Sequence, residues 1–154
     1  MKTTSPFSIK PLPFYSACLA LHFLFCFENL EAARCYGALQ VDKVCRVHDG
    51  DTFIVDIFDV HPLIGEKISI RIAKIDTPEI TDKREKIKKM AIEARDYVAD
   101  RLNHANIIEL TNMQRDKYFR ILADVYIDGI DLAEELISKG LAKPYDGAKK
   151  PVWE

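Results

Sequence analysis

The segment that most constrains the fold is KISIRIAKI, residues 67–75, in which apolar and polar side chains alternate with a period of two residues. Successive side chains of a β-strand point to opposite faces, so Ile68, Ile70 and Ile72 share one face. The pattern therefore predicts a strand that buries one face in a core. Arg71 falls on the opposite face of this strand.

Similar patterns along the chain predict the remaining elements. Alternating or β-branched runs predict strands over 41–48, 52–60, 106–113 and 120–127. Helical spacing of apolar residues predicts a helix over 87–103, and a capping-box pattern from Asp131 to Glu134 predicts a second helix over 132–139, ended by Gly140. Five strands with a helix between the third and the fourth have the order of an OB-fold. We therefore expect a β-rich α+β domain, a five-stranded Greek-key barrel with two helices.

The N-terminal part of the chain has a different character. Residues 14–27, FYSACLALHFLFCF, are almost continuously apolar over about 14 residues, too few for a comfortable membrane span and suited to a signal peptide. We expect a signal peptide over 1–33, a linker over 34–40 and the globular domain over 41–154. The protein would then be secreted or periplasmic, with no stable membrane association after cleavage. An uncleaved membrane anchor or an ordinary buried segment are the alternatives.

The positions of the four cysteines are compatible with export of the protein but do not by themselves indicate it. Cys18 and Cys26 would leave with the signal peptide, whereas Cys35 and Cys45 would remain. The remaining pair could form a disulfide or stay as two thiols, and the sequence leaves both open. The histidines are scattered without ligand spacing, so the sequence does not predict a zinc site.

The overall charge limits how the chain could bind nucleic acid. The formal net charge is -2, which argues against broad electrostatic binding to a phosphate backbone. Any phosphate site must therefore be local.

Polar side chains, all but one of them charged, gather at the ends of three expected strands. They are Asp51 after the first hairpin, Arg71 within the third strand, Asp76, Thr77 and Glu79 beyond it, and Arg120 at the start of the fifth strand. Oxygen ligands from two of the aspartates and a main-chain carbonyl would suit calcium. Two guanidinium groups could grip a phosphate with paired hydrogen bonds. Taken singly, each group also fits an ordinary turn or a charge at the barrel rim.

Four segments in order, HDGDTF, IRIAKIDTPE, DKYFRILADVYIDG and LISKGLAKPY, resemble the thermonuclease family of staphylococcal-nuclease-like OB-folds. The resemblance covers about residues 40–146. It implies a hydrolase that cleaves DNA and RNA with calcium and leaves 3′-phosphate ends. We expect such an enzyme to act as a monomer.

The resemblance also implies roles for the acidic residues. Asp51 and Asp76 match the calcium carboxylates of the family, and Thr77 matches its carbonyl ligand. Glu79 matches the proposed general base, which orients or deprotonates water. The loop after Glu79 is shorter than in many members of the family.

The basic and aromatic residues are matched in the same way. Arg71 and Arg120 correspond to the two phosphate-binding arginines, and Lys117 and Tyr118 resemble residues that contact a terminal phosphate. Tyr145 lies near the position of a base-stacking tyrosine. This chain departs from the family at one neighbouring position: the family commonly has glycine just before the second arginine, where this chain has Phe119.

Two non-enzymatic readings compete with the nuclease. A non-catalytic binding module of the same fold would usually lose charges of the site, and this chain keeps them. An OB-fold that only binds single strands would want aromatic residues interleaved with basic ones. Phe53 and Phe58 instead alternate with Asp56 and Asp59, which favours the enzyme.

Overall fold

The computed structural model describes residues 36–154, which lie within one compact unit. The expected signal peptide and Cys35 fall outside the described residues. The strands are β1 (Leu39–Gln40), β2 (Lys43–Asp49), β3 (Thr52–Asp56), β4 (Ile68–Ile72), β5 (Ile75–Asp76), β6 (Ile108–Arg115), β7 (Ile121–Ile127), β8 (Ile130–Asp131) and β9 (Lys143–Pro144). The helices are α2 (Pro62–Gly65), α3 (Glu85–Asn103) and α4 (Leu132–Ser138).

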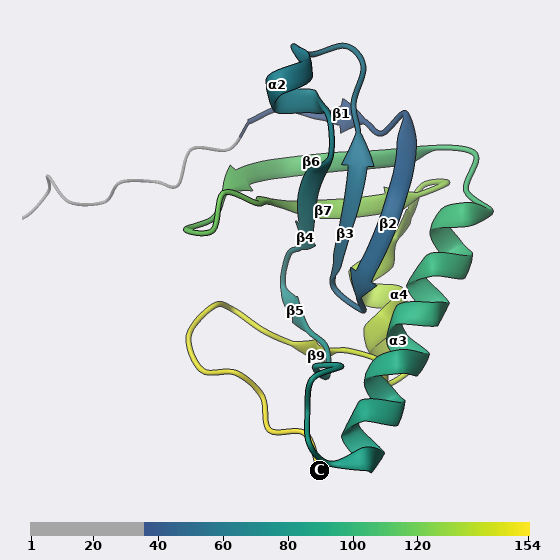
Figure 1. Ribbon diagram of the computed structural model, residues 1–154, viewed down its shortest axis with the longest axis vertical. Helices are drawn as coiled ribbons and strands as arrows, with labels where there is room; N and C mark the ends of the chain where they lie inside the picture. Colours follow the sequence, from purple (N-terminus) through teal and green to yellow (C-terminus); the bar gives the residue numbers. More distant parts are fainter. Residues whose placement is uncertain (1–35) are drawn as a thin grey trace, which may run out of the picture. The chain divides into compact units, whose positions relative to one another are not determined.

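The main sheet has the strand order β1-β6-β7-β4-β3-β2, with β8 paired to β7. Strands β4 and β7 are parallel, and the other pairs in this sheet are antiparallel. In Figure 1 the sheet curls, so that β6 and β7 run across β2, β3 and β4, while α3 lies along one side. This arrangement confirms the predicted β-rich α+β class and the OB-fold. The parallel pair places Arg71 opposite Leu122 and so brings the third and fifth predicted strands together.

The core is built from residues of this sheet together with residues of α3 and α4. Phe53, Ile70 and Ile72 are fully buried, as the alternation of apolar residues predicts. The buried face of α3 consists of Ile87, Ala91, Ala94, Val98 and Leu102. These residues recur every three or four positions, which places them on one side of a helix that packs against β2.

A short helix forms where a turn was predicted, and the strand before it is shorter than predicted. The strand expected over 52–60 ends at Asp56, and α2 forms where a turn was expected. Pro62 occupies the first helical turn, and the ring Nδ1 of His61 accepts a hydrogen bond from the Leu63 amide at 3.2 Å. The described part of the chain therefore has three helices instead of the two expected.

The strand expected over 67–75 is also divided. It ends at Ile72, and Lys74 has a φ of 66°, a left-handed conformation that breaks strand geometry. The chain then continues as β5, which pairs with β9 instead of with the main sheet. This pairing sets Asp76 opposite Lys143 and brings the C-terminal segment beside the predicted site.

Two expectations about export remain untested. Within residues 36–154 no helix has both the length and the apolar character needed to cross a bilayer. Cys45 carries a free, exposed thiol, and its possible partner Cys35 is not described. The signal peptide and the localisation therefore stay predictions.

Candidate active site

A cavity of about 470 Å³ opens at the edge of the sheet, between the β2–β3 turn and the β6–β7 hairpin. It is lined by Asp49, Asp51, Thr52, Arg71, Glu79, Lys117, Tyr118, Arg120, Leu122, Tyr145, Gly147 and Lys150. All of the predicted site residues line this cavity except Asp76 and Thr77, which are buried beside it. The fold thus brings together side chains that come from four separate segments.

Arg71 links the two buried aspartates. The register of β3 and β4 sets Arg71 opposite Thr52, next to Asp51. One guanidinium nitrogen, Nη1, forms an ion pair with Asp51. The other, Nη2, donates to the Ile75 carbonyl at 3.1 Å and lies 3.8 Å from Oδ1 of Asp76. These three contacts, with Asp51, the Ile75 carbonyl and Asp76, fix the guanidinium group in position, so Arg71 is not a mobile charge at the barrel rim.

The Asp-Gly-Asp turn has a structural reason to contain glycine. Gly50 is buried, and a Cβ at this position would lie 2.8 Å from Cβ of Ala94 and 3.0 Å from Cγ2 of Thr77. The turn can therefore pack against α3 only because this residue has no side chain. This close packing points Asp51 inward, toward the end of β5.

Asp51 is held by several donors in that position. Oδ1 accepts from the Thr52 hydroxyl at 2.9 Å, and Oδ2 accepts from the Thr77 amide at 3.3 Å. Burial raises the pKa of the Asp51 carboxyl, while the charge of Arg71 opposes that rise.

Asp76 presents one oxygen without a hydrogen bond. Its Oδ2 accepts from Nε1 of Trp153 at 3.1 Å. Its Oδ1 is buried and has no hydrogen-bond partner among the described residues. The nearest charged groups are Arg71 and Lys150, whose nitrogens lie 3.8 and 3.5 Å away.

These residues fit a hard divalent cation. Calcium prefers carboxylate and carbonyl oxygens, and it accepts open sites completed by water. The buried Oδ1 of Asp76, beside the Asp51 carboxylate, is an oxygen that lacks a donor and could serve as a ligand. Nowhere in residues 36–154 do three or more His, Cys, Asp or Glu side chains form a metal-binding group. A cation here would therefore depend on two carboxylates, the Thr77 carbonyl and water.

Glu79 lies at the open side of the cavity, and its side chain is 57% exposed. Its Oε1 accepts a hydrogen bond from Nζ of Lys150 at 2.7 Å. This bond is the main reason that the pKa of Lys150 is raised above its ordinary value.

The β6–β7 hairpin carries the second predicted arginine. Nε of Arg120 donates to Oδ2 of Asp116 at 2.8 Å, and Oδ1 of Asp116 accepts from the amides of Tyr118 and Arg120. Burial would raise the pKa of Asp116, but these hydrogen bonds outweigh it and lower the pKa. The guanidinium carbon of Arg120 lies 5.3 Å from the centre of the Tyr118 ring. Asp116 therefore holds this loop together and orients Arg120.

The backbone conformation of Phe119 explains why the thermonuclease family, which this chain resembles, commonly has glycine at this position. Its φ is 65°, in the left-handed region that glycine adopts without strain. Phe119 is 81% exposed, while the next residue, Arg120, still lines the cavity. The aromatic residue has therefore not displaced the arginine.

Replacing Phe119 with glycine is expected to raise the free energy of unfolding by about 0.5–1 kcal/mol, because relief of the left-handed strain exceeds the entropy that glycine loses. Urea unfolding measures this change. The matched control is Phe119→Ala, which removes the ring but keeps the strained backbone. An equal gain in both variants would show that the exposed ring, and not the backbone, is responsible.

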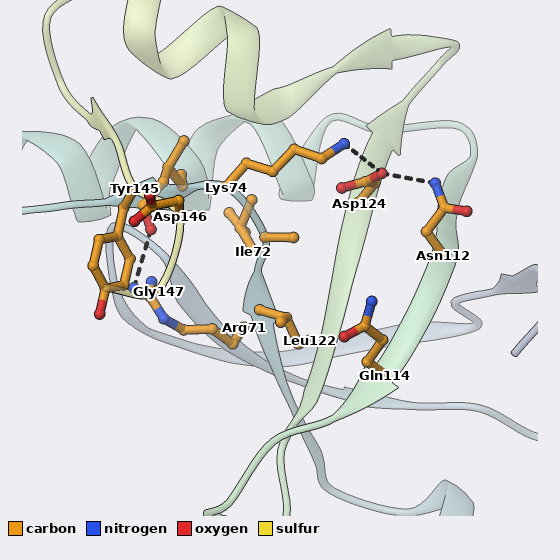
Figure 2. A pocket seen from close by; sticks show the side chains of 12 residues that line it. Arg71, Ile72, Lys74, Asn112, Gln114, Leu122, Asp124, Tyr145, Asp146 and Gly147 are labelled. Carbon is orange, nitrogen blue, oxygen red and sulfur yellow. Dashed lines mark hydrogen bonds and ion pairs between the residues drawn. The ribbon is translucent and has the colours of Figure 1, made fainter. Parts of the chain in front are cut away.

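A second pocket of about 410 Å³ adjoins the first, and both are lined by Arg71, Leu122, Tyr145 and Gly147. Figure 2 shows its far end, where Lys74 and Asn112 each lie 2.8 Å from Oδ2 of Asp124. The Tyr145 amide donates to the Lys74 carbonyl at 2.8 Å. Tyr145 lines both pockets, and its predicted contact with a base stays a prediction.

Asp49, Thr52, Leu122 and Gly147 also line the cavity without having been predicted, but the unpredicted residues that contact the predicted acids from far along the chain are Lys150 and Trp153. Both lie beyond the segments that carry the resemblance, and each reaches an acid more than seventy positions earlier in the chain. The one available signal was that Trp153 is the single tryptophan of the chain and is buried despite lying next to the last residue.

The curled sheet and the charged cavity define an OB-fold of the nuclease type. The family model described as "Staphylococcal nuclease homologue" matches residues 69–152, and the chain belongs to this family.

Curated relatives agree with this assignment. A thermonuclease from Staphylococcus hyicus is 32% identical over 105 residues, covering 68% of this chain and 59% of the relative. Endonuclease YncB from Bacillus subtilis is 33% identical over 100 residues, covering 64% and 44%. A probable endonuclease from Schizosaccharomyces pombe is 31% identical over 93 residues, covering 56% and 40%. The aligned part of the chain thus spans between 40% and 59% of the length of these relatives.

Proposed function

We propose that this protein is an exported, calcium-dependent nuclease that hydrolyses phosphodiester bonds of DNA and RNA. The observation that supports this most strongly is the single cavity lined by Arg71, Arg120 and Glu79, beside the buried carboxylates of Asp51 and Asp76. The names of the relatives, thermonuclease and endonuclease, support the same class of activity. Membership of the family makes a nuclease the expected activity, and the metal, the products and the residue roles are our proposals.

The two arginines would bind the phosphate that reacts. Arg71 is fixed by the buried aspartates, and Arg120 is fixed by Asp116, so both guanidinium groups are oriented before substrate arrives. Oriented charges of this kind stabilise the negative charge that builds up as a phosphodiester is attacked. A calcium ion held by Asp51, Asp76 and the Thr77 carbonyl would add electrostatic stabilisation of the same oxygens.

Glu79 would act on the attacking water. Its carboxylate lines the cavity and is open to solvent, so it can orient a water molecule and accept its proton. The water oxygen then forms a bond to phosphorus while the bond from phosphorus to the 5′ oxygen breaks. The products are a 3′-phosphate and a 5′-hydroxyl, whose oxygen takes up a proton.

Neighbouring residues would hold the rest of the substrate. Lys117 and Tyr118 lie on the same hairpin as Arg120 and line the cavity, where they would contact an adjacent phosphate. Tyr145 would stack against a base. Because the net charge is -2, binding would depend on these local contacts more than on a general electrostatic field.

The test is to incubate the purified protein with DNA or RNA, first with calcium and then with excess chelator. We expect cleavage only with calcium, poor substitution by magnesium, which requires a tighter octahedral site, and products that a 3′-phosphatase converts to 3′-hydroxyl ends. Full activity in excess chelator would show that the metal assignment is wrong. Binding without cleavage under all conditions would favour the non-catalytic module.

A further inference from the structure

The C-terminal segment after β9 returns to the acidic side of the site. In Figure 1 this segment, in yellow, loops away from β9 and comes back toward the start of α3. Two bonds fix its end: Nζ of Lys143 donates to the Val152 carbonyl at 2.8 Å, and Nη1 of Arg84 donates to the Trp153 carbonyl at 2.7 Å. The Trp153 side chain is buried beneath Nζ of Lys143, 4.7 Å from the ring centre. The segment is therefore anchored at two adjacent residues, Val152 and Trp153, by side chains from two other parts of the chain.

The anchored segment delivers two side chains to the acids. Trp153 donates to Oδ2 of Asp76, which leaves the buried Oδ1 without a hydrogen-bond partner among the described residues. Nζ of Lys150 lies 3.5 Å from that Oδ1 and 2.7 Å from Oε1 of Glu79. One ammonium group thus contacts both a predicted metal ligand and the predicted general base.

The space that Nζ of Lys150 occupies, beside Oδ1 of Asp76, is also the space that a divalent cation bound to this carboxylate would occupy. Asp76 is 3% exposed in its side chain, and a buried carboxylate without a compensating charge is costly. The Oδ1 atom that lacks a hydrogen bond lies 3.5 Å from Nζ of Lys150 and 3.8 Å from Nη2 of Arg71. Arg71 is also paired with Asp51, so Lys150 is the cation that a metal ion could displace. A metal ion and an ammonium group cannot both occupy the space in front of a single oxygen.

We propose that Lys150 is the resident counter-cation of Asp76 and Glu79, and that a divalent cation binds at Asp76 by displacing it. This inference rests on the proposed function, since it takes the Asp51–Asp76 site as the metal site. Lys150 is then a positioning residue that sets the calcium affinity. If the ammonium engages the acids in about 90–99% of metal-free molecules, the apparent calcium affinity is about 10- to 100-fold weaker than the intrinsic affinity.

The test is a calcium titration of the full chain. Binding is monitored by calorimetry and by the fluorescence of Trp153, the single tryptophan. Lys150→Met should tighten calcium binding about 10- to 100-fold, because the competing cation is gone. Lys150→Arg keeps the charge and should bind close to the wild type. The matched control is Lys149→Met, which removes the same charge from an exposed neighbour that does not line the cavity. Lys150→Gln serves as the second neutral variant if methionine impairs folding.

Several results would overturn the proposal that a divalent cation displaces Lys150. An unchanged or weaker affinity in the two neutral Lys150 variants would do so while leaving the nuclease proposal intact. Equal tightening in Lys149→Met would show a long-range charge effect in place of displacement. Absence of calcium binding in all variants would overturn both the displacement and the calcium site. Binding by the Lys150 variants with none by the wild type would support the displacement in its strongest form.

Discussion

Replacing Arg120 with alanine is expected to lower kcat on DNA by at least about 10²–10³-fold while the protein remains folded. The guanidinium group lines the cavity and is oriented by Asp116. Its charge would act mainly on the transition state, in which negative charge accumulates on the phosphate oxygens. The measurement is steady-state kinetics beside thermal unfolding, so that a loss of activity is separated from a loss of stability.

The matched control is an arginine that contacts neither the cavity nor the β6–β7 hairpin. Arg115 is unsuitable, because its Nη1 donates to the Phe119 carbonyl beside Arg120. Arg46→Ala removes the same charge from an exposed residue that does not line the cavity, and it should change kcat little. Arg120→Lys should recover little of the activity, because an ammonium group cannot supply the planar fork of donors. Near-wild-type turnover in folded Arg120→Ala would show that this arginine is a rim charge without a catalytic role.

Arg71 offers a less clean test of the same idea. It pairs with Asp51 in a buried position and also supports the Ile75 carbonyl. Removing one partner of a buried ion pair costs about 3–5 kcal/mol, so a loss of activity in Arg71→Ala would mix catalysis with unfolding. The ion pair of Arg120 is more exposed, which makes its variants easier to interpret.

The features that the sequence predicted well depend on local pattern. Ile70 and Ile72 are buried and Arg71 is not fully buried, because alternation along a strand is a direct consequence of backbone geometry. The helix capped by Asp131 begins where predicted, since its side chain accepts from the amides of Ala133 and Glu134. The acids and arginines of the site come from such segments, and this is why the sequence could place them at strand ends.

The features that it missed depend on contacts over long distances in the chain. Strand β5 forms only because β9 pairs with it, and no local pattern at Ile75 and Asp76 encodes that partner. The break at Lys74 is a left-handed residue that propensity would not place there. Lys150 and Trp153 reach the site through the packing of the C-terminal segment, which alternation and spacing do not describe.

Glu79→Gln is expected to lower kcat by about 10²–10⁴-fold, because the amide cannot accept the proton of the attacking water. The change keeps the size of the side chain. Stability should change little, since an exposed ion pair such as that with Lys150 contributes about 0–1 kcal/mol. The Kd for a non-hydrolysable DNA analogue should stay the same or fall, because a negative charge near the phosphate is removed.

The separation of kcat from binding is what distinguishes a general base from a structural partner of Lys150. A structural partner would alter calcium affinity or the melting temperature, and saturating calcium would restore turnover. A general base leaves turnover low at every calcium concentration. The control is Glu66→Gln, an exposed carboxylate outside the cavity, which should behave as the wild type. If folded Glu79→Gln turns over normally, the base lies elsewhere. Asp49 would then be the next candidate, since it lines the cavity with a buried Oδ1 that has no hydrogen-bond partner among the described residues.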